Sequence, residues 1–169
     1  MKRAAALAIM LAVAGAGCGS KSPSSPSNQP TVFNVQLRAS NETPPVTNAE
    51  SNASGTAVIT FNTTKDSSGN ITAATVDFNV TMSGFPNGST AILAHIHPGA
   101  AGVSGSPLVN TGLTAGTGVA MPNGTGTFSF TGISVSADTA TQIIAAPQNF
   151  YFNVHTTVNP NGAIRGQLK

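Results

Sequence analysis

The sequence has few charged residues, a single cysteine and no tryptophan. Charged residues make up 7% of the 169 residues and aromatic residues 5%. A nucleic-acid-binding protein needs a basic patch and aromatic or hydrogen-bonding side chains to read bases, and neither pattern is present, so we expect no nucleic-acid partner. With Cys18 as the only cysteine, no disulfide can brace the folded part, which must depend on its apolar core.

Motifs of common enzymes are also missing. The five carboxylates are dispersed along the chain, which argues against a glycosidase pair. The segment 66–70 is a hairpin turn, far too short for a calcium loop. No serine has the flanks of a nucleophile elbow, and the glycine-rich run 112–126 lacks the lysine of a phosphate loop. These absences favour a binding or structural module over an enzyme.

The N-terminus is typical of an export signal. Lys2 and Arg3 precede an apolar run, residues 4–13, that is too short to span a bilayer. Small residues then lead to Cys18, which resembles a bacterial lipoprotein signal whose cysteine is lipidated after cleavage. A plain secretory signal cut nearby, leaving Cys18 free, is the alternative. We predict a signal peptide over 1–17, a Ser/Pro-rich tether over 18–30 and a folded domain over 31–169.

This organisation predicts an extracytoplasmic protein of the bacterial cell envelope. It would be lipid-anchored at the outer membrane or cell surface, or secreted if Cys18 is not lipidated. The expected partners are the membrane, through Cys18, and an envelope or extracellular protein. Loss of residues 1–17 lowers Lys+Arg from 7 to 5, equal to Asp+Glu, so the mature chain is close to neutral.

The folded part reads as short strands between Gly, Pro and Asn turns. This predicts an all-β, Greek-key β-sandwich or barrel, immunoglobulin-like or superoxide dismutase-like. One short helix is expected near 136–146, with Ser136 as its N-cap, and a tight turn at Asn159, Pro160 and Gly162. Leu108, Val109 and Leu113 are expected to pack against the core. The expected strands are 33–37, 57–61, 76–82, 91–97, 127–133, 150–156 and 163–168.

The only three histidines of the chain lie in two of these strands. His95 and His97 are two residues apart, so they project from the same face, and His155 can join them from a neighbouring strand. The bulky apolar residues, including Ile92 and Ile96, occupy the opposite face. We therefore expect the histidines outside the sheet, beneath a loop. Three imidazoles there suit copper or zinc, or else hydrogen-bond the loops and hold them down.

Arg165 belongs to the same face only if the last hairpin has a loop of odd length. A five-residue loop, 158–162, would place Arg165 directly opposite His155. A cation beside a metal would draw small anions to it. The alternative is an arginine that hydrogen-bonds loop carbonyls.

The motifs of the chain resemble those of the CHRD (chordin-type) domain family, as found in bacterial lipoproteins. The matching stretches cover about 32–168 and depart at Ala163, where the family usually has glutamate. The resemblance implies a β-sandwich, an extracytoplasmic location and no well-established activity. The stretches are Glu42–Val46 (ETPPV), Ala94–Gly99 (AHIHPG), Phe152–Thr156 (FNVHT) and Asn159–Leu168 (NPNGAIRGQL).

A weaker resemblance, limited to the site, is to copper-zinc superoxide dismutases. It implies His95, His97 and His155 as copper ligands and Arg165 as an anion guide. No bridging histidine, zinc loop or disulfide accompanies them, so such a site would hold copper only, with an open fourth position. Two functions therefore remain: a binding or structural module with a three-histidine metal site, or a copper-binding redox protein or copper-only dismutase. Copper is favoured over zinc, and affinity is expected to fall below about pH 6.

Overall fold

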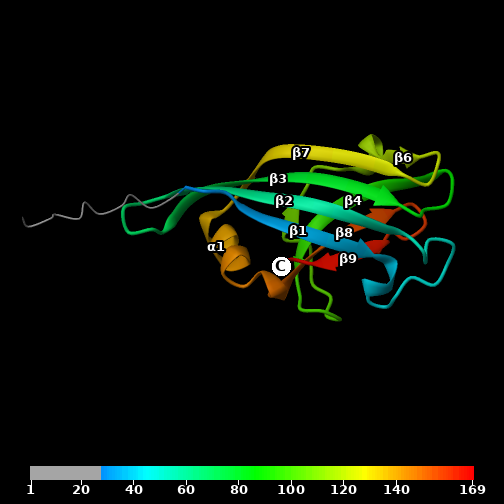
Figure 1. The fold of residues 1–169 in the computed structure, drawn as a ribbon, viewed down its shortest axis with the longest axis horizontal. Coiled ribbons are helices and arrows are strands. Elements are labelled where there is room, and N and C mark those ends of the chain that lie inside the picture. The colour runs from blue at the N-terminus through cyan, green and yellow to red at the C-terminus, as the bar shows by residue number, and fades with distance from the viewer. Residues whose placement is uncertain (1–27) are drawn as a thin grey trace, which may run out of the picture.

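The computed structural model describes residues 28–169 (Figure 1). The predicted signal peptide, Cys18 and the tether up to residue 27 lie outside the described residues. Within them, no helix has the length and apolar character needed to cross a membrane.

The described residues form an antiparallel, nearly closed barrel, as the sequence predicts. Its strand order is β5-β4-β8-β9-β1-β2-β3-β7, with β6 paired to β4 and lying against β7. The run β9-β1-β2-β3, in which the last strand returns beside the first, is a Greek-key arrangement. The strands are β1 (Thr31–Arg38), β2 (Ser54–Lys65), β3 (Ile71–Ser83), β4 (Ser89–Pro98), β5 (Val109–Asn110), β6 (Val119–Met121), β7 (Gly126–Val135), β8 (Phe150–Thr156) and β9 (Ile164–Gln167).

The core fills the barrel because alternate residues of each strand point inward. In β3 the residues of the predicted alternation, Val76, Phe78, Val80 and Met82, are buried, and Ala74 extends the pattern. Phe78 stacks on Phe152 of β8, with ring centroids 5.7 Å apart. The two sides of the barrel therefore meet through aromatic contact, without any disulfide among the described residues.

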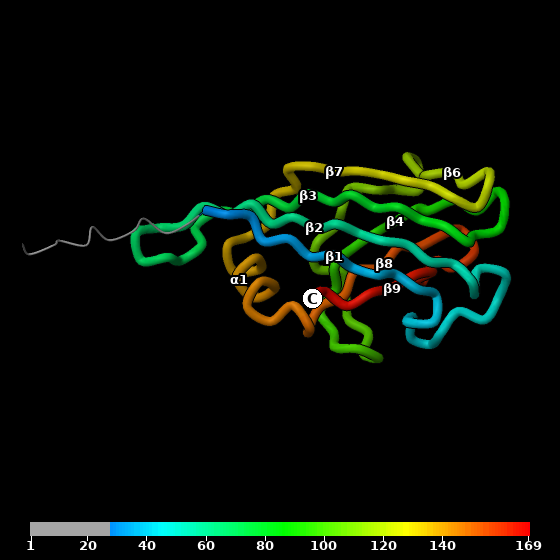
Figure 2. The backbone as a smooth tube through the Cα atoms, viewed as in Figure 1, coloured from blue at the N-terminus to red at the C-terminus, as the bar shows by residue number. Residues whose placement is uncertain are grey.

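Helix α1 (Ala137–Ala145) confirms the predicted helix. The Ser136 hydroxyl accepts a hydrogen bond from the Thr139 amide at 3.1 Å, as an N-cap does. Ala140 and Ile143 are its buried residues, and a 3-10 turn, Pro147–Asn149, follows it. Figure 2 shows α1 at one end of the barrel. In the chain, α1 lies in the connection from β7 to β8.

Two packing predictions are wrong in detail. Leu108 is 42% exposed, whereas Val109 and Leu113 are buried as expected. Ile92 is only partly buried because a register shift between Ala91 and Leu93 puts Ala91 in the core instead. The short strands β5 and β6 were not expected, because their runs of two and three residues give no alternation to detect.

Candidate metal centre

Strands β4 and β8 bring the three histidines together. In their antiparallel register His95 faces Asn153, His97 faces Tyr151 and Leu93 faces His155. The histidine side chains therefore share one face, while Ala94, Ile96 and Val154 pack into the core. Loops cover the three rings, so only 8%, 4% and 7% of His95, His97 and His155 are exposed. They lie on the outer face of the sheet and beneath loops, as the sequence predicts.

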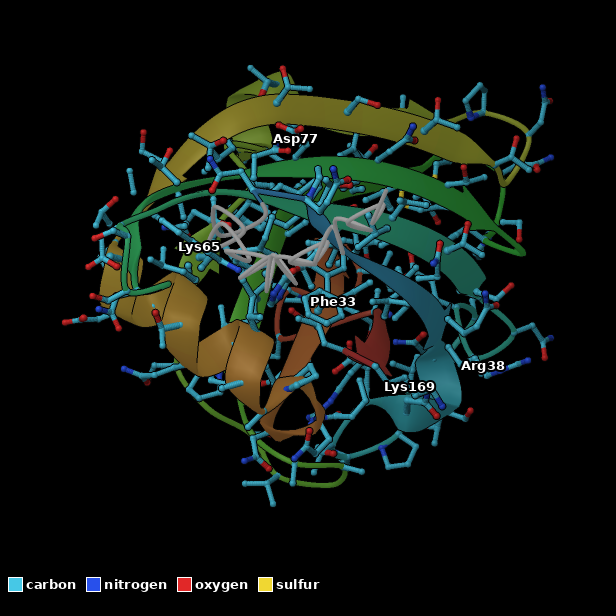
Figure 3. The ribbon with its side chains drawn as sticks, turned by 60° about the vertical axis from the view of Figure 1, so that its left-hand side comes forward. Phe33, Arg38, Lys65, Asp77 and Lys169 are labelled. Carbon is cyan, nitrogen blue, oxygen red and sulfur yellow. The ribbon has the colours of Figure 1, made fainter. Side chains whose placement is uncertain are left out.

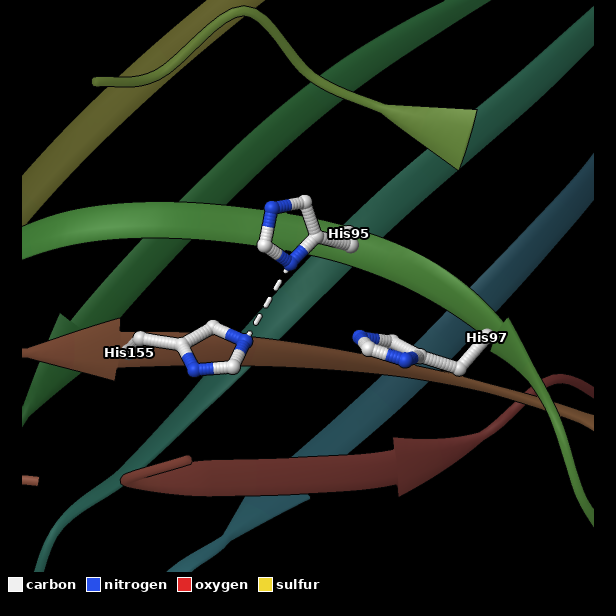
Figure 4. A group of neighbouring side chains, drawn as sticks. All are labelled: His95, His97 and His155. Carbon is white, nitrogen blue, oxygen red and sulfur yellow. Dashed lines mark hydrogen bonds between the residues drawn. The ribbon is translucent and has the colours of Figure 1, made fainter. Parts of the chain in front are cut away.

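The rings converge closely enough to share an ion (Figure 4). His95 Nδ1 lies 3.2 Å from His155 Nε2, and one ligand atom from each histidine lies within 4.8 Å of the others. Two nitrogens bound to one ion at about 2.0–2.1 Å are roughly 2.8–3.4 Å apart when the angle between the bonds is about 90–110°. The closest pair already has this spacing, and small ring movements bring the third nitrogen into range.

Backbone carbonyls fix the tautomer of two rings. His97 Nδ1 donates to the Gly105 carbonyl at 2.8 Å, and His155 Nδ1 donates to the Pro160 carbonyl at 2.9 Å. In a neutral imidazole the other nitrogen, Nε2, then carries the lone pair, and in His155 it accepts a hydrogen bond from His95 Nδ1. This carbonyl support is the outer contact that metal-binding histidines usually have. His97 Nε2 is buried and has no hydrogen-bond partner.

Burial keeps the histidines neutral. It lowers the pKa of His95 to about 4, with further contributions from charge on His155 and His97. The pKa values of His97 and His155 are also lowered, chiefly by burial, against the opposing effect of their bonds to the Gly105 and Pro160 carbonyls. Neutral imidazole is the form that binds a metal ion.

Tyr151 and Arg165 continue the polar layer beside His97. The Tyr151 ring stacks on His97 at 4.8 Å, nearly parallel, and the Arg165 guanidinium carbon lies 3.4 Å from the Tyr151 ring centre. Since β4 and β9 flank β8 on opposite sides, the tyrosine ring lies between the other two groups. Arg165 is 1% exposed and donates to the carbonyls of Ala100 and Val103. It therefore fastens the loop that covers the histidines.

The register of the last hairpin differs from that of a five-residue loop. Arg165 lies opposite Asn153, two residues from His155, because the pairing of β8 with β9 ends at Val154 and Ile164. A shift of two residues preserves the face, so Arg165 still shares the side of His155. Within the connection, the Gly162 amide donates to the Asn159 carbonyl across Pro160, and Gly162 has a φ of 134°.

Two acidic residues of the layer were not predicted to belong to it. Glu42 is 7% exposed, and its Oε1, like Oδ1 of Asn153, is buried without a hydrogen-bond partner. Burial raises the pKa of Glu42 to about 7, against the charge of Arg165 and the side chain of Asn153. Glu50 is fully buried and accepts hydrogen bonds from Ser89, Thr156 and Asn159. The only signal for Glu42 in the sequence was its place in a family motif.

The change Glu42→Gln is expected to alter how stability depends on pH. The pKa of Glu42 is higher in the folded chain than in an unfolded one, so this group stabilises the fold as pH falls from 8 to 5. Glutamine removes that effect. The difference in free energy of unfolding, variant minus wild type, should therefore be about 2 kcal/mol higher at pH 8 than at pH 5. Urea unfolding of both proteins at both pH values measures this difference, in which the opposite contributions of the histidines cancel. A difference that does not change with pH would contradict the raised pKa.

Comparison with known proteins gives one match. The family model of the CHRD domain matches residues 33–168. Neither the comparison with curated proteins nor the comparison with solved structures gives a match.

Proposed function

The chain belongs to the CHRD domain family, and from that premise we propose that it is an exported β-barrel module that binds one copper ion through His95, His97 and His155. The observation that carries the proposal is the arrangement of the ring nitrogens. Two lone pairs are set by carbonyl contacts, and the closest ring nitrogens are 3.2 Å apart. Surface histidines that merely held loops would need only their Nδ1 contacts and would not need Nε2 of His97 buried without a partner.

Copper is the metal that this ligand set favours. Imidazole nitrogen suits both copper and zinc, and for a given nitrogen site the affinity of divalent ions peaks at copper. Three protein ligands leave a further position for water or a small molecule. When bound, copper would supply one-electron chemistry or a rigid cross-link between β4 and β8. The residues around it exclude water and hold the histidines neutral.

Burial favours a carrier or structural role over rapid turnover. The three histidines are at most 8% exposed, and the loop fastened by Arg165 lies over them. A copper-only dismutase is the second candidate, supported by Arg165 on the same face. There the guanidinium would guide superoxide only after its bonds to Ala100 and Val103 open. A superoxide assay on the copper-loaded protein separates the two roles.

The location and the partners are part of the same proposal. Lipidation of Cys18 would anchor the domain in the bacterial cell envelope through the tether, where it would meet an envelope or extracellular protein. The support is the sequence pattern of residues 1–18. Labelling with a radioactive fatty acid, and release of a Cys18→Ser variant from the membrane fraction, test the anchor.

Titration of the purified metal-free protein with Cu(II) tests the copper site. The protein is prepared without a histidine tag, and its metal content is also measured as purified. One equivalent should bind with submicromolar affinity and should resist an equal concentration of zinc. Binding of less than one equivalent, or displacement by zinc, would contradict the assignment of copper.

Copper affinity should persist at mildly acidic pH. Since burial lowers the pKa of all three histidines, and that of His95 to about 4, protons compete weakly for them. Between pH 7 and 5.5 we expect a much smaller loss than the roughly several hundredfold that three ordinary imidazoles would show. The loss of copper affinity that the sequence predicts below about pH 6 should therefore begin at a lower pH. A steep loss measured by competition with a chelator would count against the buried, neutral site.

A further inference from the structure

A cavity of about 580 Å³ lies beside β1 and β9 on the outer side of the barrel. This is a volume typical of pockets for small molecules. Polar and charged side chains dominate its wall, among them Gln36, Arg38, Glu42, Arg165, Gln167 and Lys169. None of the three histidines lines it, so it is separate from the candidate metal centre.

Positive charge is concentrated at this cavity. Residues 28–169 contain four lysines and arginines, and three of them line the cavity: Arg38, Arg165 and Lys169. Figure 3 shows Arg38 and Lys169 close together on one side of the barrel and Lys65, the fourth, on the other. In a domain with so few charges, this clustering creates a local positive potential.

The two arginines lie directly opposite each other. Arg38 of β1 pairs with Arg165 of β9, and both point outward because Leu37 and Ile164 point into the core. Like charges at such a position destabilise a sheet. The contacts of Arg165 are with neutral carbonyls and a tyrosine ring, which do not cancel its charge. Glu42, the carboxyl of the wall, has its pKa raised to about 7 and supplies only part of a negative charge at neutral pH.

We propose that this cavity binds a small oxyanion, a phosphate or carboxylate group, held by Arg38 and Lys169, while the buried charge of Arg165 in the cavity wall adds to the attraction. A guanidinium group presents paired N–H donors that match such oxygens. The class that fits best is therefore a small molecule carrying a phosphate or a carboxylate group.

Calorimetric titration of the processed protein with two probes tests this site. Inorganic phosphate and malate should each saturate with a dissociation constant of about 1 mM or less. Arg38→Gln should weaken phosphate binding at least about tenfold, because it removes a charged donor. Lys65→Gln, which changes the same charge elsewhere, should leave it unchanged. Glu42→Gln should strengthen phosphate binding by removing a nearby negative charge.

Failure of phosphate and malate to saturate, or equal weakening by Arg38→Gln and Lys65→Gln, would overturn the oxyanion site. A preference for phosphate over malate would identify a phosphorylated ligand, and the reverse a carboxylate, within the same site. Copper titration of Arg38→Gln should match wild type, so the two sites can fail independently.

Discussion

Replacing His97 with alanine is expected to weaken Cu(II) binding at least about a hundredfold, since loss of a ligand should exceed the 10–100-fold effect of losing an outer contact. His97 is the most buried of the three histidines, and its Nε2 is the ring nitrogen without a partner. Its ring is held from two sides, by the Gly105 carbonyl and by the stacked ring of Tyr151. A ligand fixed in this way loses little side-chain entropy when the ion binds.

The control must separate ligation from packing. His97→Ala also removes the contact with Tyr151 and so loosens the covering loop. Tyr151→Phe keeps the stacked ring and removes only the hydroxyl group that contacts Gly105. If His97 is a ligand, Tyr151→Phe should bind copper within about tenfold of wild type, and the electron paramagnetic resonance spectrum should lose a nitrogen coupling only in His97→Ala. Equal affinity of His97→Ala and wild type would exclude His97 as a ligand.

The sequence predicts the histidine face well because strand alternation determines it. Two residues of spacing place His95 and His97 together in any strand, and the apolar residues opposite them identify the inner face. Sequence reasoning also finds the face of the sheet on which Arg165 lies, because a register shift of two residues leaves each side chain on the same face. Sequence reasoning does not find which residue of β8 lies opposite Arg165, because the pairing of β8 with β9 depends on contacts that no local pattern encodes.

The remainder of the polar layer depends on contacts between distant segments. Glu42 is more than a hundred residues from Asn153 and Arg165 in sequence, yet it joins them in one layer because β1 lies beside β9. Leu108 looked apolar enough for the core, yet its position after the covering loop leaves it exposed. Such placements follow from the order of strands in the sheet, which composition and periodicity do not determine.

Glu50→Ala is expected to lower the free energy of unfolding by about 3–5 kcal/mol, because each buried polar group that loses its partner costs about 1–3 kcal/mol. Glu50 is 0% exposed, and its two oxygens accept hydrogen bonds from Ser89, Thr156 and Asn159 at 3.0, 2.6 and 2.6 Å. These donors belong to β4, to the end of β8 and to the connection that follows it. Alanine removes the acceptor of the Ser89 and Thr156 hydroxyls, leaves Asn159 Nδ2 with only Asn48 Oδ1 at 3.3 Å, and opens a cavity where the side chain was.

The same change should reach the metal centre through the β8–β9 connection. Glu50 holds Asn159, and the next residue, Pro160, supplies the carbonyl that orients His155. We therefore expect copper affinity to fall about tenfold in Glu50→Ala even under conditions where the variant is folded, because His155 loses its fixed orientation. Urea unfolding and copper titration measure the two effects separately. Asp138→Asn, which changes an exposed carboxylate on α1, should cost less than about 1 kcal/mol and leave copper binding unchanged. A Glu50→Ala variant as stable as Asp138→Asn would show that the buried carboxylate does not hold the connection in place.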